Sequence, residues 1–528
     1  MIYFLFSNNL IFNNMIYIYV NICDDHKFLK KFFNYVPSQT ISYRKICNSL
    51  IMLQIEEGRK LDHSIDIKDT NGQQIKKSLN ERIENLNKSS IKSVTTIFKV
   101  TVGLSESNPD AYKPKLLSIG PYHKHDSKLG SMENYKLCYL QRFLKRNGGF
   151  HDVESCISEM DKLKDDAFKC YDDIGGLIDI CNIVEIFSEM LLLDGCFAVE
   201  FIREQCKIIP TGEDMIIMRD CIRNQLKRDL LLVENQLPWF VLTKLYEISK
   251  EENEKPFIAM VNRTFSLAKS SIKTKDIEEN VKHLFHVVHM FMSFGPSKKI
   301  IPSEFRNIPT IRSLCGGWRG GFKDEDMMWH KIMPNATELF EAGVSFANVG
   351  NIFMRSLENV KDNNLKDNTC LFDIKFNNGL MTIPCFQVVD ETETLMRNLI
   401  AYEQQSSDVQ QRYFSDFAVF MDYLIDSDKD VSLLCMNGII VNKLGEDKQV
   451  ASFFNKIGKG IAVSEDFYYE EECRKAVQHC EKPCNRIGAN FRHNYFNTPW
   501  AGISTLAAII LLLLTATQTV LAFISLFK

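Results

Sequence analysis

The sequence predicts an α-rich protein of the α+β class, with a large helical body, a small antiparallel sheet and one C-terminal transmembrane helix. Three observations predict this fold. Apolar residues recur at helical spacing over much of the chain, a short region alternates apolar and polar residues, and the last uncharged stretch runs over residues 501–527. The length of 528 residues suits either several ordinary domains or one large helical body.

The composition limits the class of protein and its partners. With 45% hydrophobic and 25% charged residues, the chain is unlike collagen-like, low-complexity or wholly disordered proteins. Lys and Arg total 63 against 67 Asp and Glu, so no cationic field is expected to attract a phosphate backbone, and no nucleic-acid partner is predicted. The 16 cysteines include no CxxC pair. We expect them to be mostly reduced and buried.

Residues 1–96 are predicted to be a leader. The first 23 residues carry no charge and are rich in Ile, Phe and Tyr, but they have no basic start and no small-residue cleavage site, so a signal peptide fits poorly. Two interpretations stay open. Translation starts at Met52, or residues 1–23 direct secretion and place the body outside the cell. Residues 53–96 are polar, which predicts a disordered or loosely helical segment.

The folded body is predicted over residues 97–495. Helical periodicity begins with Met132, Tyr139 and Phe143 and recurs in 177–204, 217–248, 277–293, 392–404 and 411–426. The region of about 340–390 has a different pattern of apolar and polar residues. Residues 343–346, 371–376 and 380–383 alternate apolar and polar, and the turn sequence Asn377-Asn378-Gly379 lies between the last two. This pattern predicts a small antiparallel sheet.

Residues 496–528 are predicted to be a membrane anchor. The uncharged stretch from Ala501 to Phe527 exceeds the roughly 20 helical residues that cross a bilayer. Pro499 suits the first position of a helix, and Trp500 suits the interface. Only Lys528 follows, so we expect a tail anchor that binds membrane lipid through 501–527. The basic residues before it, Arg474, Lys475, Lys482, Arg486 and Arg492, favour a cytosolic body.

A polar cluster interrupts the anchor. Gln518 lies among Thr515, Thr517 and Thr519, and a carboxamide in hydrocarbon favours self-association through bonds between helices. The alternative is that Gln518, about 27 Å beyond Trp500 at 1.5 Å per residue, reaches the opposite headgroups and needs no partner helix. A homo-oligomer is therefore one of two hypotheses for this cluster.

Several ordered blocks resemble the plant family known as domain of unknown function 247, also called UPF0481. The resemblance covers roughly residues 90–528 and rests on Ser118–His123, Met132-Glu133 with Lys136, Asp194–Phe197, Leu232–Pro238, Ala336–Phe346, Arg397–Gln404, Asn437–Ile440 and Tyr495–Trp500. The chain departs from the family pattern at Lys124-His125-Asp126. The resemblance implies a C-terminal hydrophobic helix and no established enzymatic activity, and some grass members are implicated in self-incompatibility recognition.

Polar residues inside apolar runs are the candidate binding or catalytic groups. Glu234, Asn235 and Gln236 interrupt the run 230–240, so Glu234 is either a carboxylate in a dry cleft with acid–base chemistry or part of a structural junction before Pro238. Glu403, near Arg397 on a predicted helix, raises the same question. We favour a structural junction for Glu234 and an ion-pair network for Glu403. Asp194 and Glu200, six residues apart, are expected on different helical faces.

Two further groups of residues admit a binding hypothesis. Tyr122 and His123 end the Gly-Pro turn at 118–123, where packing is favoured over a pocket. The spacing of His283, His286 and His289 fans over about 120° of a helix, which favours packing over a metal site. A second set, Cys473, His479, Cys480 and Cys484, has no matching pair of ligands. No metal or cofactor is therefore predicted.

The leading functional hypothesis is a membrane-tethered, non-enzymatic recognition or scaffold protein that binds a protein or peptide, in signalling or self-recognition. It rests on the predicted anchor and on the lack of familiar catalytic sequences such as GxSxG, a Walker A loop or HExxH. The alternative is an unrecognised hydrolase or transferase that uses Glu234 or Glu403 as a buried carboxylate.

Overall fold

The structure is a computed structural model that describes residues 95–146, 152–172, 183–206, 220–265, 280–293, 333–352, 370–464, 466–495 and 499–526, with residues 77, 79 and 80. The chain divides into two units, Met1–Ile91 and Lys92–Lys528. All elements below belong to the second unit. The leader predicted over 1–96, including Met52, lies almost entirely outside the described residues.

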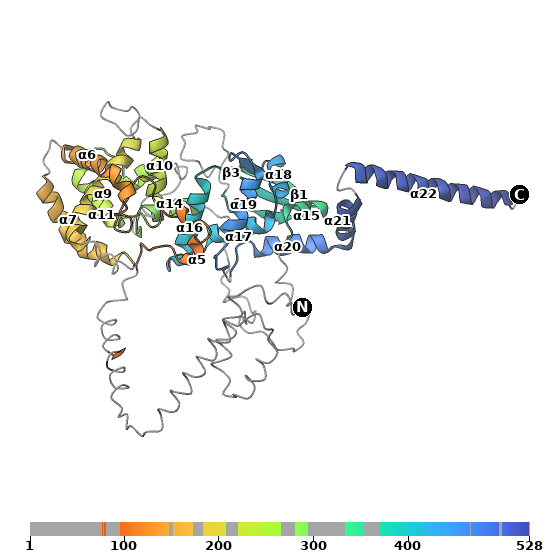
Figure 1. Ribbon diagram of the computed structural model, residues 1–528, viewed down its shortest axis with the longest axis horizontal. Coiled ribbons are helices and arrows are strands. Elements are labelled where there is room, and N and C mark those ends of the chain that lie inside the picture. The colour runs from red at the N-terminus through yellow and green to blue at the C-terminus, as the bar shows by residue number, and fades with distance from the viewer. Residues whose placement is uncertain are drawn as a thin grey trace, which may run out of the picture. The chain divides into compact units, whose positions relative to one another are not determined.

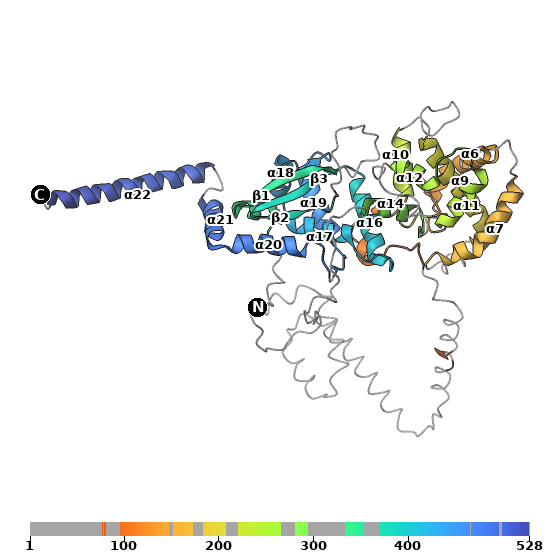
Figure 2. The ribbon, with the colours of Figure 1, turned by 180° about the vertical axis from the view of Figure 1, so that it is seen from behind.

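The first half of the body is helical and is built around α9, Ile183–Cys206. Figure 1 shows α9 among α6 (Glu133–Leu144), α7 (Val153–Lys169) and α11 (Trp239–Ser249), and Figure 2 also labels α12 (Phe257–Phe265); all four pack on α9. From Phe187 to Ile202 nearly every side chain is buried, and most of these side chains are apolar. The other elements of this half are α5 (Val102–Ser105), η3 (Pro109–Ala111), η4 (Ser127–Met132), α10 (Asp220–Leu230) and α14 (Leu284–Ser293).

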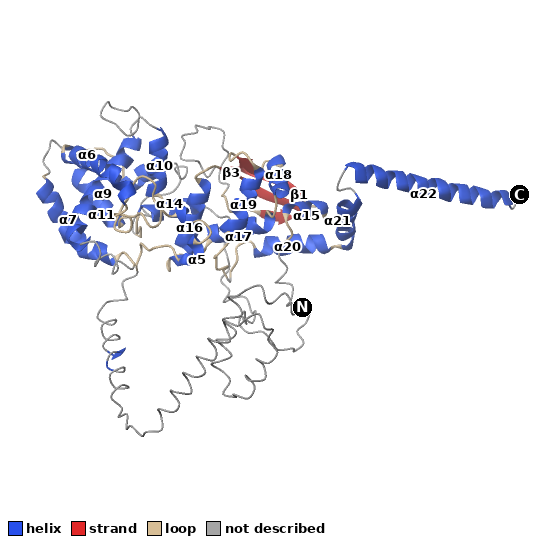
Figure 3. Cartoon of the chain, in the orientation of Figure 1, coloured by secondary structure: helices blue, strands red, loops and turns tan. Residues whose placement is uncertain are grey.

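The second half combines helices with a small sheet, and Figure 3 shows its strands in red among helices. Its elements, seen from behind in Figure 2, are α15 (Ala336–Glu341), β1 (Ser345–Ile352), β2 (Lys375–Asn377), β3 (Leu380–Val388), α16 (Thr392–Gln405), α17 (Tyr413–Leu424), α18 (Asp428–Met436), β4 (Ile440–Asn442), α19 (Asp447–Ile457), α20 (Glu470–Glu481) and α21 (Pro483–Tyr495). The predicted α-rich class with a small sheet is confirmed.

The predicted antiparallel direction of this sheet is wrong. The central strand β3 pairs in parallel with both β1 and β4, and it is antiparallel only to the three residues of β2. Alternation of apolar and polar residues reveals a strand but carries no information about its direction. The one antiparallel pair is the one whose turn the sequence marks, because Asn378 and Gly379 both have positive φ, 49° and 82°.

The last element is the helix α22, Pro499–Leu526, which starts at the proline that the sequence marks. Its stretch Ile503–Phe523 is long and apolar enough to cross a membrane. None of that stretch is buried against the rest of the described chain, and Trp500 at its start is exposed. Large aliphatic side chains such as Leu512 and Leu513 therefore face outward.

Candidate functional site

Five of the predicted site residues lie at or near one irregular segment, residues 97–120, which we call the N-terminal strap: Tyr122, His123, Glu234, Asn235 and Gln236. The other predicted residues lie elsewhere, Glu403 of α16 against the start of α17 and Trp500 and Gln518 in α22. The strap holds only the short helical turns α5 and η3, so most of its backbone amides have no partner within regular structure. Buried amides need partners wherever they occur. Side chains from residues 194–236 and from α16 supply them.

Asp229, at the end of α10, binds the strap most extensively. Its fully buried carboxylate accepts hydrogen bonds from the backbone N–H groups of Lys115, Leu116 and Leu117 at 2.7–3.1 Å. Arg228 donates to the same carboxylate at 2.8 Å and to the carbonyls of residues 110 and 113. A buried carboxylate with this many donors is satisfied and needs no ligand.

Asn235 and Gln236, two of the predicted binding residues, also bind backbone groups. Asn235 accepts from the N–H of Ile119 at 2.7 Å and donates to the carbonyls of Leu117 and Asp229. Gln236 donates to nearby carbonyls, including that of Leu230 at 2.8 Å, and accepts from a backbone N–H of α14 at 2.9 Å. Both amides are buried and their bonds tie the junction between α10 and α11 to its neighbours.

Glu234, His123 and Tyr122 come together beside residues 97–100. Glu234 Oε1 accepts from the N–H of Val100 at 2.8 Å, and Glu234 Oε2 lies 3.2 Å from His123 Nε2. The two side chains are 13% and 16% exposed, but the His123 Nε2 atom that faces Glu234 is itself buried. The hydroxyl of Tyr122 lies 2.6 Å from the carbonyl of Asp172. Glu234 and His123 are the most exposed of the predicted site residues in the body.

Asp194 and Lys136 fix the end of the strap at Gly120. Asp194 accepts from the N–H of Gly120 at 2.9 Å and lies 2.6 Å from the fully buried ammonium of Lys136. Burial alone would lower the pKa of Lys136, but the carboxylates of Asp194 and Glu133 outweigh it and raise that pKa. Gly120 has φ of 76°, and a Cβ there would lie 2.6 Å from the carbonyl oxygen of Gln236. No larger residue fits.

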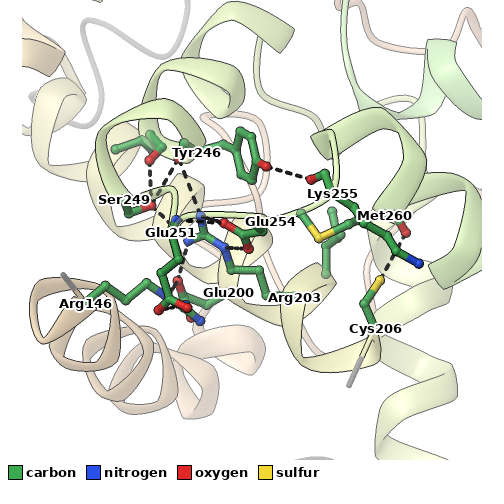
Figure 4. Close-up of polar contacts among 12 residues, drawn as sticks. Arg146, Glu200, Arg203, Cys206, Tyr246, Ser249, Glu251, Glu254, Lys255 and Met260 are labelled. Carbon is green, nitrogen blue, oxygen red and sulfur yellow. Dashed lines mark hydrogen bonds and ion pairs between the residues drawn. The ribbon is translucent and has the colours of Figure 1, made fainter. Parts of the chain in front are cut away.

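A second charged cluster lies on the other side of α9, as expected for Glu200 six residues after Asp194. Figure 4 shows the Arg203 guanidinium against Glu200 and Glu254, with Arg146 bound to Glu200 through two hydrogen bonds of 2.7 and 2.8 Å. Each of these carboxylates has a cationic partner. The cluster ties Arg146, just after α6, and helix α9 to the turn after α11, and no sequence pattern predicted it.

Glu403, the other predicted carboxylate, caps a helix. It is fully buried and accepts from the N–H groups of Phe414 and Ser415 at 3.0 and 2.7 Å, at the start of α17. His289 Nε2 lies 3.3 Å from it. Arg397 binds Glu393 instead, at 2.8 Å. Glu403 therefore lies apart from Glu234, but among the described residues it lies near a second acid, Asp416 of α17, whose pKa its charge raises.

The predicted histidine and cysteine groups are used in packing. The rings of His283, His286 and His289 surround Tyr402 with centroids 5.0–5.5 Å away. Burial lowers the pKa of His286 to about 4, so this ring is neutral near pH 7. His479 packs on the turn of β2 and β3 at Gly379. Over the described ranges no three metal-ligating side chains converge, and the cysteines there are free thiols.

Replacing Asp229 tests whether the strap depends on its carboxylate. Asp229→Ala leaves the three backbone N–H groups of Lys115, Leu116 and Leu117 without an acceptor and removes the anionic partner of Arg228. Loss of one partner of a buried charged pair costs about 3–5 kcal/mol. We expect the free energy of unfolding of the full chain in detergent, measured by denaturant titration, to fall by that amount. The exposed Asp390→Ala is the matched control and should change it by less than about 0.5 kcal/mol. Equal effects of both substitutions would refute the structural role.

Comparisons with known proteins assign the chain to a family. A family model described as a plant protein of unknown function, DUF247, matches residues 97–514. Among curated relatives, UPF0481 protein At3g47200 of Arabidopsis thaliana is 27% identical, and the match covers 81% of this chain and 86% of the relative's length. Putative UPF0481 protein At3g02645 of the same plant is 22% identical, and the match covers 84% of this chain and 93% of the relative's length. No solved structure matches significantly. The chain therefore belongs to the DUF247 family of plant proteins of unknown function.

Proposed function

We propose that this protein is a recognition or scaffold protein, without enzymatic activity, that α22 tethers to a membrane. The observation that carries the tether is the helix itself. Its 21 residues Ile503–Phe523 expose large apolar side chains along their whole length, with no cover from the rest of the described chain. An uncovered apolar surface of this length is unfavourable in water and matches the thickness of a bilayer.

The polar residues of α22 are compatible with lipid. The hydroxyls of Thr515, Thr517 and Thr519 donate to carbonyls of their own helix at 2.7–2.9 Å. These groups therefore enter hydrocarbon without unsatisfied donors. Gln518 has a carboxamide, which gains most from a second helix, and association of two copies through Gln518 is part of the proposal.

Charge at the centre of α22 tests the tether. The double substitution Leu512→Arg with Leu513→Arg introduces two cations near the bilayer midplane, each unfavourable by about 2.5–3.5 kcal/mol. We expect the wild-type chain to remain in the pellet after alkaline carbonate extraction of membranes and the variant to move to the supernatant. The matched control, Leu137→Arg with Met436→Arg, changes two exposed apolar residues of the body and should stay in the pellet. Extraction of the wild type contradicts the tether.

We further propose that the body lies in the cytosol. No acidic residue follows Glu481, whereas Lys482, Arg486 and Arg492 precede the helix. A cationic flank of this kind is retained on the cytosolic side. Two N-glycosylation sequons lie among the described residues, Asn262-Arg-Thr264 and Asn335-Ala-Thr337. They do not oppose this orientation, because both are built into the fold. The Asn335 side chain caps α15, and Thr264 of the other sequon is buried.

Glycosylation tags measure this orientation. A short acceptor sequence after Lys528 should be glycosylated in microsomes, because a tail anchor with a cytosolic body places the C-terminus in the lumen. The same tag placed before Met1 should stay unmodified. A glycosidase-sensitive mobility shift of the N-terminal tag, with none for the C-terminal one, would reverse the proposed orientation.

The absence of enzymatic activity is supported by how the buried carboxylates are used. Asp229, Glu403 and Asp194 each accept hydrogen bonds from the backbone, which employs them in holding segments together. The partly exposed pair His123–Glu234 favours the alternative function, a hydrolase or transferase, because an imidazole beside a carboxylate supports acid–base chemistry. Even in this pair, Glu234 also has a structural contact, because it accepts a hydrogen bond from the N–H of Val100.

Glu234→Gln separates the two functions, because the amide oxygen retains the bond to Val100 and the charge is lost. We expect tagged full-length chain, cross-linked in its native membranes, to be recovered with one protein or peptide partner in a fixed ratio, the same for wild type and Glu234→Gln. Repeated recovery of the chain alone would count against recognition. A turnover found by activity profiling that disappears in Glu234→Gln would establish the enzyme instead.

A further inference from the structure

A second irregular segment, described over residues 460–464 and 466–469, lies between α19 and α20 and thus leads toward α22; we call these described residues the C-terminal strap. Two side chains hold its backbone. Gln404, near the end of α16, donates to the carbonyl of Ala462 at 3.2 Å and accepts from the N–H of the same residue at 3.0 Å. Asp416, in the first turn of α17, accepts from the N–H of Tyr468 at 2.9 Å and from the hydroxyl of Ser464 at 3.1 Å.

The two straps meet at the end of α16. The neighbouring residue Gln405 binds the N-terminal strap, through the carbonyl of Lys99 at 2.9 Å and the N–H of Thr101 at 3.0 Å. Gly460, at φ of 82°, approaches Gly103 so closely that a Cβ would lie 2.3 Å from the Gly103 oxygen. The C-terminal strap is therefore held in place by α16, by α17 and by the N-terminal strap.

Among the side chains of Gln404, Gln405 and Asp416, which make these hydrogen bonds to the straps, only that of Asp416 can titrate. Its side chain is buried, and besides the strap it accepts from Gln411 at 3.2 Å. The charged groups that face it are Glu403 of α16 and Arg412 before α17, and the phenols of Tyr413 and Tyr469 lie nearby. Burial raises the pKa of Asp416 to about 7, and Glu403 adds to that increase, against the opposing effects of Tyr468, Ser464 and Arg412.

We propose that Asp416 is a proton-operated latch, which as the neutral acid holds the C-terminal strap against α17 and as the carboxylate loosens it. The chemistry of the contacts fits both states. The neutral acid still accepts from the N–H of Tyr468 and can donate its own proton to the Ser464 oxygen. The carboxylate keeps Tyr468 and Ser464 as donors, and these bonds and Arg412 compensate part of its charge. Burial and the neighbouring charge of Glu403 outweigh this compensation, so the charged form is unfavourable in the closed site.

The direction of the pH effect follows from linkage. The pKa of about 7 in the closed strap exceeds the ordinary value of 3.8, so the closed form binds the proton more tightly than the open form. Closure is therefore favoured at low pH, is lost progressively as the pH rises from about 4 to about 7, and changes little above 7. The link from this latch to a membrane rests on the proposed function, whereas the latch itself does not.

Hydrogen exchange at the Tyr468 amide measures the latch in the full chain, held in detergent micelles so that the result does not depend on membrane insertion. After correction for the intrinsic exchange rate, we expect protection of this amide to fall by up to about tenfold per pH unit between pH 5.5 and 7 and to level off above 7. The amide of Thr337, bound at 2.8 Å by Asp430, is the internal control. Hydrogen bonds from Thr337 and Ser427 outweigh burial and lower the pKa of Asp430, so its protection should stay constant.

Two variants make the test specific. Asp416→Asn resembles the neutral acid in shape and hydrogen bonding, and it should keep the Tyr468 amide protected with no pH dependence. Gln404→Ala removes the part of the attachment that cannot titrate, and it should lower protection at every pH without changing the slope. Protection in the wild type that is independent of pH, or a slope that persists in Asp416→Asn, would overturn the latch. Should Asp416→Asn not fold, Gln404→Ala with an altered slope would overturn it equally.

Discussion

The body depends on hydrogen bonds from buried side chains to the backbone of the N-terminal strap. This segment has little helix and no strand of its own, so several of its amides, such as those of Val100, Leu116 and Ile119, bind side chains and not backbone carbonyls. Asp229, Asn235 and Glu234 supply acceptors in the way that a neighbouring strand would in a sheet. Asn398 of α16 extends the arrangement, because its side chain binds both Ala111 of the strap and Val233.

This constraint explains why residues that look catalytic in the sequence have structural contacts here. From the sequence, Glu234 and Glu403 could each be a carboxylate in a dry catalytic cleft or a structural contact. In the structure, Glu403 caps α17. Periodicity predicted helices such as α6, α9 and α16, and length with polarity predicted α22, because both are local properties. The direction of β1 and β4 and the pairing of Arg203 with Glu254 depend on contacts between residues far apart in sequence, which periodicity does not encode.

The end of α16 holds both straps, and the two attachments differ in the residues that make them. Gln405 and Gln404, adjacent in sequence, hold the N-terminal and C-terminal straps respectively, so one helix end organises the entry of the chain into the body and its exit toward α20. The contacts to the N-terminal strap involve Asp229 and Asn235. The exit includes Asp416, whose pKa burial raises to about 7, and this is the attachment that we propose to respond to pH. An exit of this kind would suit the tethered recognition protein that we propose.

The most direct test of the central claim is native-state hydrogen exchange at the amides of Leu116 and Leu117 in the full-length chain. If Asp229 holds these amides as a neighbouring strand would, they should exchange as slowly as amides in the middle of α9, such as that of Cys196, and only through global unfolding. Exchange at the rate of an exposed turn such as the one at Gly445 would show that the strap is held by something other than buried hydrogen bonds.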